Sequence, residues 1–134
     1  MVNPVGEIVL SGNLLHISGQ ISFAEDGSLI KGRLGEDMDL DEGVAAARRC
    51  GIMLLAQIKA ALGSLDRVER IVKLGVFVNS AGSFTDQPKV ANGASELMQD
   101  VFGEAGRHAR SAVGVAVLPL GVAVEVDAIV AVKA

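Results

Sequence analysis

The sequence predicts an α+β domain in which one mixed β-sheet carries two helices on the same face. Three observations support this prediction: alternating apolar runs with glycine turns lie at both ends, two stretches follow helical spacing, and 134 residues suit a single domain, 1–134. Hydrophobic residues make up 50% and charged residues 21%, a balance typical of a folded globular protein. With four Phe and no Tyr or Trp, small branched side chains must fill the core, which favours packed strands.

The N-terminal region predicts a β-hairpin. Residues 7–10 and 14–21 are apolar runs joined by Ser11-Gly12-Asn13, a turn sequence. Alternation in the second run would place four residues on one face: Leu15, Ile17, Gly19 and Ile21. A second turn, Glu25-Asp26-Gly27-Ser28, leads to a short third strand at residues 29–34.

Two segments have the spacing of amphipathic helices. The first begins after Asp39, which forms an Asp-x-x-Glu capping box with Glu42, and it ends at Gly63. Its apolar positions are Val44, Ala47, Gly51, Leu54, Leu55, Ile58 and Leu62. The second helix covers residues 86–102, with Pro88 in its first turn, where a missing amide proton is tolerated, and Gly103 at its end. Its apolar stripe consists of Val90, Ala94, Leu97, Met98 and Val101.

The remaining strands are expected at residues 68–78, 110–118 and 122–132. Because a short turn joins the last two, we expect them to be adjacent, which would bring Arg110 close to Glu125. Helices on one face leave the opposite sheet face uncovered, and we expect it to carry Ile71, Gly75 and Phe77. Such an apolar face predicts a homo-oligomer in which uncovered sheet faces pack together.

Charge and composition disfavour several classes of protein. The chain has 12 Lys and Arg against 16 Asp and Glu, for a net charge of −4, and its longest basic run is Arg48-Arg49. This charge pattern makes nucleic acid a poor candidate for a partner. No apolar stretch approaches the roughly 20 residues that cross a bilayer. The first four residues, Met1-Val2-Asn3-Pro4, lack the basic and apolar regions of a signal peptide. The single cysteine, Cys50, cannot form an internal disulfide, which fits a reducing compartment. We therefore expect a cytoplasmic protein.

The residue pattern also argues against most catalytic centres. His16 and His108 are the only histidines, and neither has a metal-ligand partner at the expected spacing. Cys50 lies among small apolar residues of the first helix and is interpreted as a core residue. Ser111 lacks the context of a nucleophile elbow, and no phosphate-binding or dinucleotide-binding glycine motif occurs. Arg110 and Glu125 remain as a candidate pair, with a strand salt bridge or a solvated face as the alternative interpretation.

Several motifs together resemble the RidA/YjgF family of reactive-intermediate imine deaminases, formerly labelled endoribonuclease L-PSP. They are Ser18-Gly19-Gln20-Ile21, Arg110-Ser111-Ala112-Val113, Leu118-Pro119 and Val124-Glu125-Val126-Asp127-Ala128-Ile129. The resemblance covers nearly the whole chain. It implies a chorismate-mutase-like fold and a homotrimer with its sites in the clefts between subunits, which agrees with the oligomer inferred from the uncovered face.

The resemblance implies roles for particular residues. Arg110 matches the family arginine that grips the substrate carboxylate, a task for which a planar guanidinium is better suited than lysine. Glu125 matches the glutamate that positions the attacking water. Gly19, following Ser18, matches a glycine whose backbone closely approaches the ligand.

Other positions resemble the family less closely. Asn92 is aligned with a family asparagine at the start of the second helix, and Ala112 stands where many members have a cysteine that offers mainly main-chain groups. Val5 occupies the approximate position of a family tyrosine that lines the cleft, and residues 80–88 form an extended segment. These departures indicate a divergent subgroup.

Two functional hypotheses are compatible with these residues. In the first, the protein hydrolyses 2-imino acids, or their enamine tautomers, to 2-oxo acids and ammonia, and needs no cofactor because a protonated imine is already electrophilic. In the second, it is a non-catalytic trimer that binds a small carboxylate metabolite or a partner protein in the same clefts. A ribonuclease, the old family label, is disfavoured by the net charge and by the lack of stacking aromatic residues.

Overall fold

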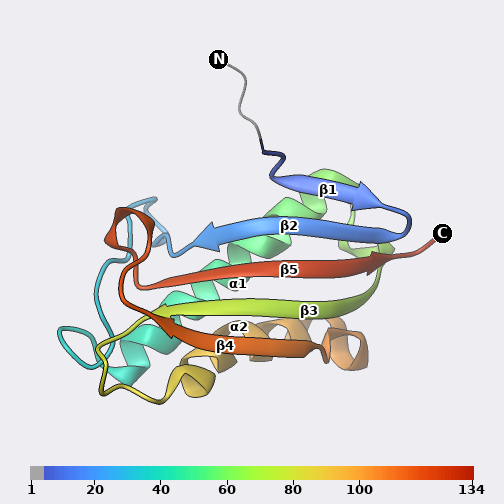
Figure 1. Ribbon diagram of the computed structural model, residues 1–134. Helices are drawn as coiled ribbons and strands as arrows, with labels where there is room; N and C mark the ends of the chain where they lie inside the picture. The colour runs from blue at the N-terminus through green and yellow to red at the C-terminus, as the bar shows by residue number, and fades with distance from the viewer. Residues whose placement is uncertain (1–4) are drawn as a thin grey trace.

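The computed structural model describes residues 5–134, so the signal-peptide expectation, which rests on Met1–Pro4, lies outside the described residues. A five-stranded sheet carries two helices (Figure 1). The strands are β1 (Ile8–Ser11), β2 (Leu14–Ile21), β3 (Val68–Asn79), β4 (Ala109–Val115) and β5 (Val124–Val132). The helices are α1 (Leu40–Leu62) and α2 (Gln87–Phe102), and three short 3₁₀ turns are η1 (Leu65–Arg67), η2 (Gly103–Gly106) and η3 (Pro119–Gly121).

The strand order is β1-β2-β5-β3-β4, with β4 parallel to β3 and every other pair antiparallel. The expectation that the last two strands are adjacent is wrong, because β3 lies between β4 and β5. Helix α2 acts as a crossover that returns the chain to the free edge of β3, and such a connection produces a parallel neighbour. Both helices cover the same sheet face, as predicted, and Figure 1 shows them behind the sheet.

The predicted helix ends are confirmed. The Asp39 side chain accepts a hydrogen bond from the Glu42 amide, the Glu42 side chain accepts one from the Asp39 amide, and Gly63 ends α1 in the left-handed conformation. Pro88 lies in the first turn of α2, which ends before Gly103. The expected stripe of α2 is wrong at Val101, which is 42% exposed.

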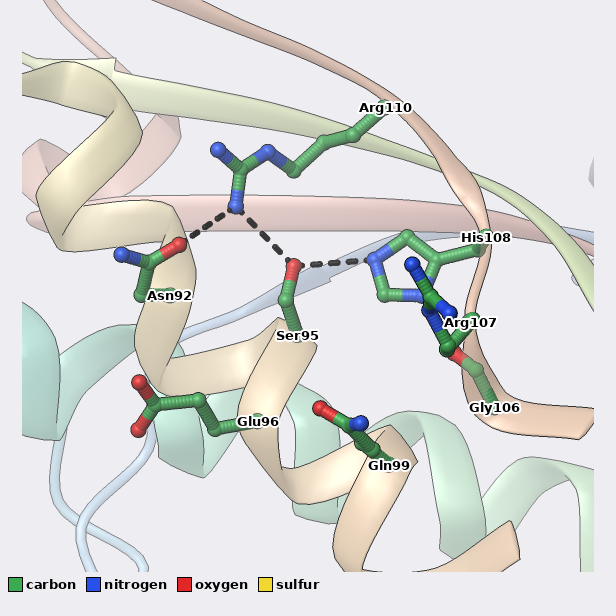
Figure 2. A pocket seen from close by; sticks show the side chains of 8 residues that line it. All are labelled: Asn92, Ser95, Glu96, Gln99, Gly106, Arg107, His108 and Arg110. Atoms are coloured by element: carbon green, nitrogen blue, oxygen red, sulfur yellow. Dashed lines mark hydrogen bonds between the residues drawn. The ribbon is translucent and has the colours of Figure 1, made fainter. Parts of the chain in front are cut away.

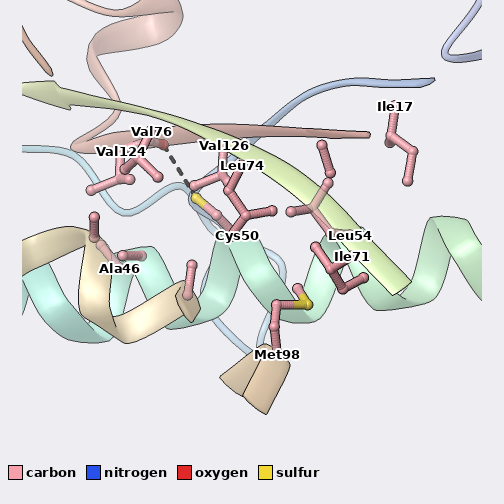
Figure 3. Packing of buried hydrophobic residues seen from close by; sticks show 14 of the residues in the cluster. Ile17, Ala46, Cys50, Leu54, Ile71, Leu74, Val76, Met98, Val124 and Val126 are labelled. Carbon is pink, nitrogen blue, oxygen red and sulfur yellow. Dashed lines mark hydrogen bonds between the residues drawn. The ribbon is translucent and has the colours of Figure 1, made fainter. Parts of the chain in front are cut away.

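A single apolar layer fills the space between the helices and the sheet (Figure 3). Leu54 from α1, Met98 from α2 and Ile71 from β3 are all fully buried in it. The expectation that Ile71 lies on the uncovered face is wrong. A register shift between Ile71 and Lys73 turns it toward the helices, while Gly75 and Phe77 keep their predicted side.

A second register shift, between Ile17 and Gln20 in β2, overturns part of the predicted alternation. Leu15 and Ile17 are buried beneath the helices as expected, but beyond the shift it is Gln20 that is buried. Gly19 and Ile21 therefore belong to the uncovered face.

The segment before α1 is irregular. The turn at residues 25–28 is confirmed, because the Ala24 amide donates to the Ser28 carbonyl and Gly27 has a positive φ of 87°. The short strand predicted at residues 29–34 is wrong: this stretch forms only isolated bridges, such as the one between Lys31 and Val122. Neither helix in residues 5–134 has both the length and the apolar composition to cross a membrane.

Candidate functional site

Arg110 extends from the edge strand β4 toward helix α2 (Figure 2). Its partner in the ladder, Leu74, is buried beneath the helices, so the Arg110 side chain leaves the sheet on the helix-covered side. One guanidinium nitrogen donates to Asn92 Oδ1 at 2.8 Å and to Ser95 Oγ at 3.1 Å. Asn92 and Ser95 are three residues apart on α2 and therefore face the strand together.

These side chains line a polar pocket of about 560 Å³ between α2 and the start of β4. The residues around it are Asn92, Ser95, Glu96, Gln99, Gly106, Arg107, His108 and Arg110. None of them has an apolar side chain, so a ligand in this pocket would be recognised by charge and hydrogen bonding.

No carboxylate of residues 5–134 forms an ion pair with Arg110. Within residues 5–134, the ion pairs are Arg33–Glu36, Lys89–Asp86 and Arg107–Glu104. The acceptors that hold Arg110 are a neutral amide and a neutral hydroxyl. A guanidinium held in this way retains donors for an anion, and a carboxylate matches its planar fork.

Ser95 and His108 continue the hydrogen-bond chain away from Arg110. Ser95 Oγ is 2.9 Å from His108 Nε2, and His108 Nδ1 is 2.6 Å from the Gly106 carbonyl oxygen. Burial lowers the pKa of the His108 imidazole, the Gly106 carbonyl opposes this, and the charge of Arg110 lowers it further. Ser95 and His108 were not predicted as residues of a carboxylate site, and the helical spacing of Asn92 and Ser95 is the sequence signal that points to Ser95.

Glu125 lies on the uncovered face of the sheet, in β5, opposite Ile21 of β2 and Phe77 of β3. Its carboxylate occupies the space beside Gly19, where any side chain would collide with it. Burial and the nearby charge of Asp127 raise the pKa of Glu125. A raised pKa makes the carboxylate a stronger base toward a bound water molecule.

The two candidate catalytic residues are therefore separated within one chain. Arg110 leaves the sheet on the helix-covered side, Glu125 lies on the opposite face, and β3 runs between their strands. One small ligand cannot contact both side chains of the same copy.

The structure also places the remaining predicted site residues. Asn92 accepts a hydrogen bond from Arg110, and Ala112 is half-buried on the same face of β4 as Arg110. Ser18 is next to Gly19 and donates from its hydroxyl to the Gly6 carbonyl oxygen at 3.1 Å. Val5 is 64% exposed near the start of the described chain.

Comparison with known proteins relates this geometry to a family. A model described as "YjgF/chorismate mutase-like, putative endoribonuclease" matches residues 4–131. Protein TCP17 of Trypanosoma cruzi is 58% identical over 123 residues, which cover 91% of this chain and 77% of that protein. A 2-iminobutanoate/2-iminopropanoate deaminase of Dermatophagoides farinae is 26% identical over 133 residues, which cover 98% of this chain and 88% of the deaminase.

A solved structure agrees in fold. The crystal structure of Atu1372, a protein of unknown function from Agrobacterium tumefaciens, superposes with a TM-score of 0.94 at 44% sequence identity, covering 97% of this chain and 82% of that one. The mixed sheet with two helices on one face is therefore the α+β fold that the sequence motifs implied. Because the family model spans nearly the whole sequence, the chain belongs to the YjgF/chorismate mutase-like family.

Proposed function

We propose that the protein hydrolyses reactive 2-imino acids, or their enamine tautomers, to 2-oxo acids and ammonia in clefts between copies of the chain. The observation that carries this proposal is the Arg110 guanidinium, which neutral acceptors hold at the edge of a polar pocket and which has no carboxylate partner within residues 5–134. Such a group is suited to bind the carboxylate shared by substrate and product.

In the proposed reaction, Arg110 holds the carboxylate and Glu125 orients a water molecule toward the imine carbon. The water oxygen bonds to that carbon while one water proton passes to Glu125. The product of this step is a tetrahedral carbinolamine. Glu125 returns the proton to the nitrogen and then accepts the proton of the carbinolamine hydroxyl as the C–N bond breaks, so the carbonyl forms and ammonia leaves. This last proton passes from Glu125 to the ammonia, which departs as ammonium and leaves the carboxylate ready for another turnover. A protonated imine is already electrophilic, so this scheme requires no metal or organic cofactor.

The scheme requires Arg110 from one copy and Glu125 with Gly19 from another, because these groups lie on opposite faces of one chain. The uncovered sheet face offers a surface for assembly, since it presents Phe77, Val113 and Ile129 without a covering helix. In a homotrimer, packing of such a face against the β4 edge of the next copy would bring Glu125 of one copy to Arg110 of the other and complete each site. Light scattering tests the assembly, and a monomer at micromolar concentration would overturn it.

One relative of the chain is named for the proposed reaction. The relative named as a deaminase is 26% identical to this chain, whereas the name of the 58% identical relative, Protein TCP17, states no activity. A second candidate function is therefore binding of a small carboxylate metabolite without catalysis. It is favoured by the completeness of the Arg110 pocket in a single chain without Glu125.

Ammonia release from 2-iminobutanoate generated in solution separates the two functions. A deaminase accelerates ammonia release. Arg110→Ala should remove most of the substrate binding, about 2–5 kcal/mol if the contact is desolvated. Arg110→Lys should raise KM because lysine lacks the planar fork of the guanidinium. Glu125→Gln should lower kcat with little change in affinity for 2-oxobutanoate. The control is Arg67→Ala, an exposed arginine in η1. Binding without acceleration would assign the second function.

A further inference from the structure

We infer that Ser95 and His108 form a proton-linked donor in the Arg110 anion site: protonation of the imidazole frees the Ser95 hydroxyl to donate to a bound carboxylate. The inference rests on the anion-binding part of the proposed function and does not depend on catalysis. It adds two binding residues to the pocket, and it predicts that anion binding takes up a proton.

The hydrogen bonds fix the arrangement in the neutral state. His108 Nδ1 lies 2.6 Å from the Gly106 carbonyl oxygen, which can only accept, so Nδ1 carries the ring proton. Nε2 of the neutral ring is then an acceptor, and the Ser95 hydroxyl donates a hydrogen bond to it at 2.9 Å. The Ser95 oxygen in turn accepts from Arg110 at 3.1 Å. The hydroxyl proton therefore points away from the guanidinium and from any anion bound to it.

Protonation of the ring reverses one of these bonds. His108 Nε2 then carries a proton and donates to Ser95 Oγ, which already accepts from Arg110. With both lone pairs of the oxygen engaged, the hydroxyl proton must point elsewhere. A carboxylate gripped by Arg110 is the acceptor within reach, and it also gains the attraction of a second positive charge.

The surrounding charges make protonation depend on the anion. Arg107 and Arg110 lie beside the imidazole on its own segment, and Glu96 of α2 lines the same pocket. Glu104 of η2 pairs with Arg107 at 3.6 Å, while Arg70 of β3 donates to the backbone carbonyls of Glu104 and Arg107. Burial lowers the pKa of His108 in the free protein, so the ring is neutral near pH 7 until an anion compensates its charge.

The test is a calorimetric titration with 2-oxobutanoate at about pH 5.5 and about pH 8, a range that spans the ordinary pKa of histidine. The titration is repeated in buffers of different ionisation enthalpy to count protons. For the unmodified protein we expect about tenfold tighter binding at the lower pH, the gain from one charge-assisted hydrogen bond, together with proton uptake. His108→Gln should abolish the pH dependence. The matched control, His16→Gln on the uncovered face, should retain it.

Two further measurements keep the test independent of a single variant. Ser95→Ala should still bind 2-oxobutanoate through Arg110 but lose most of the gain at low pH. NMR titration of the His108 ring, one of only two histidines, should show its pKa rising when 2-oxobutanoate is added. Circular dichroism must show that each variant is folded.

Equal pH dependence in folded His108→Gln, or an unchanged His108 pKa in the presence of ligand, would overturn the inference. Absence of 2-oxobutanoate binding at both pH values would overturn it together with the anion site. Proton-linked binding without ammonia release would leave the inference standing and refute the deaminase.

Discussion

Mixing two inactive variants should restore activity if each site is shared between copies. Arg110→Ala and Glu125→Gln each remove one half of the proposed site, and each should lower kcat/KM by about a hundredfold or more. Because the two side chains lie on opposite faces of a chain, no single copy can supply both to one ligand. A mixed oligomer, however, contains clefts in which an intact Arg110 meets an intact Glu125.

The expected recovery can be calculated from random assembly. At equal amounts of the two variants, half of the clefts receive an intact Arg110 and half of those an intact Glu125, so about a quarter of wild-type activity should return. The variants are unfolded together, refolded and assayed for ammonia release from generated 2-iminobutanoate. Native mass spectrometry verifies that mixed oligomers form. Activity no higher than that of the parents, in a sample with verified mixed oligomers, would refute the shared site.

Two glycines and one carboxyl group provide three more tests. Gly19→Ala should displace the Glu125 carboxylate and lower kcat at nearly unchanged thermal stability, since the colliding atoms are the end of a flexible side chain; an unchanged kcat would contradict it. Gly93→Ala should lower the free energy of unfolding by about 1–3 kcal/mol, because its added methyl overlaps the α1 backbone, whereas Gly82→Ala, which meets open space, should have little effect in chemical denaturation. Finally, kcat should fall on acidification at a pH above the ordinary pKa of Glu, because burial and the charge of Asp127 raise the pKa of Glu125. Asp127→Asn removes that charge and should move the fall in kcat to lower pH. A pH profile unaffected by Asp127→Asn would argue against Glu125 as the titrating base.

Local signals in the sequence predicted the parts of the fold that depend on nearby residues. The capping box at Asp39 and the glycine at position 63 set the ends of α1, and both were readable because each acts within one helical turn. The alternation of β5 was likewise correct, with Glu125 and Asp127 on the face opposite the buried valines.

The features that depend on distant parts of the chain could not be predicted. Whether β4 joins β3 or β5 is decided by the path of the α2 crossover, and no residue near the turn at 119–121 encodes it. The register shifts next to Ile71 and after Ile17 each reverse the facing of the next residues in the strand, although the apolar pattern continues through them. The Ser95–His108 contact joins a helix to a segment 13 residues away and requires the fold to be known.

Cys50, the single thiol of the sequence, lies under the same strand that carries Glu125. It is completely shielded from solvent, its Sγ donates to the Val124 carbonyl oxygen at 3.4 Å, and burial together with the charge of Glu125 raises its pKa (Figure 3). A protein proposed to work on reactive imines and enamines thus keeps its single thiol away from them. A thiol reagent can therefore react only when α1 separates from the sheet, so the rate of alkylation records how often this layer opens.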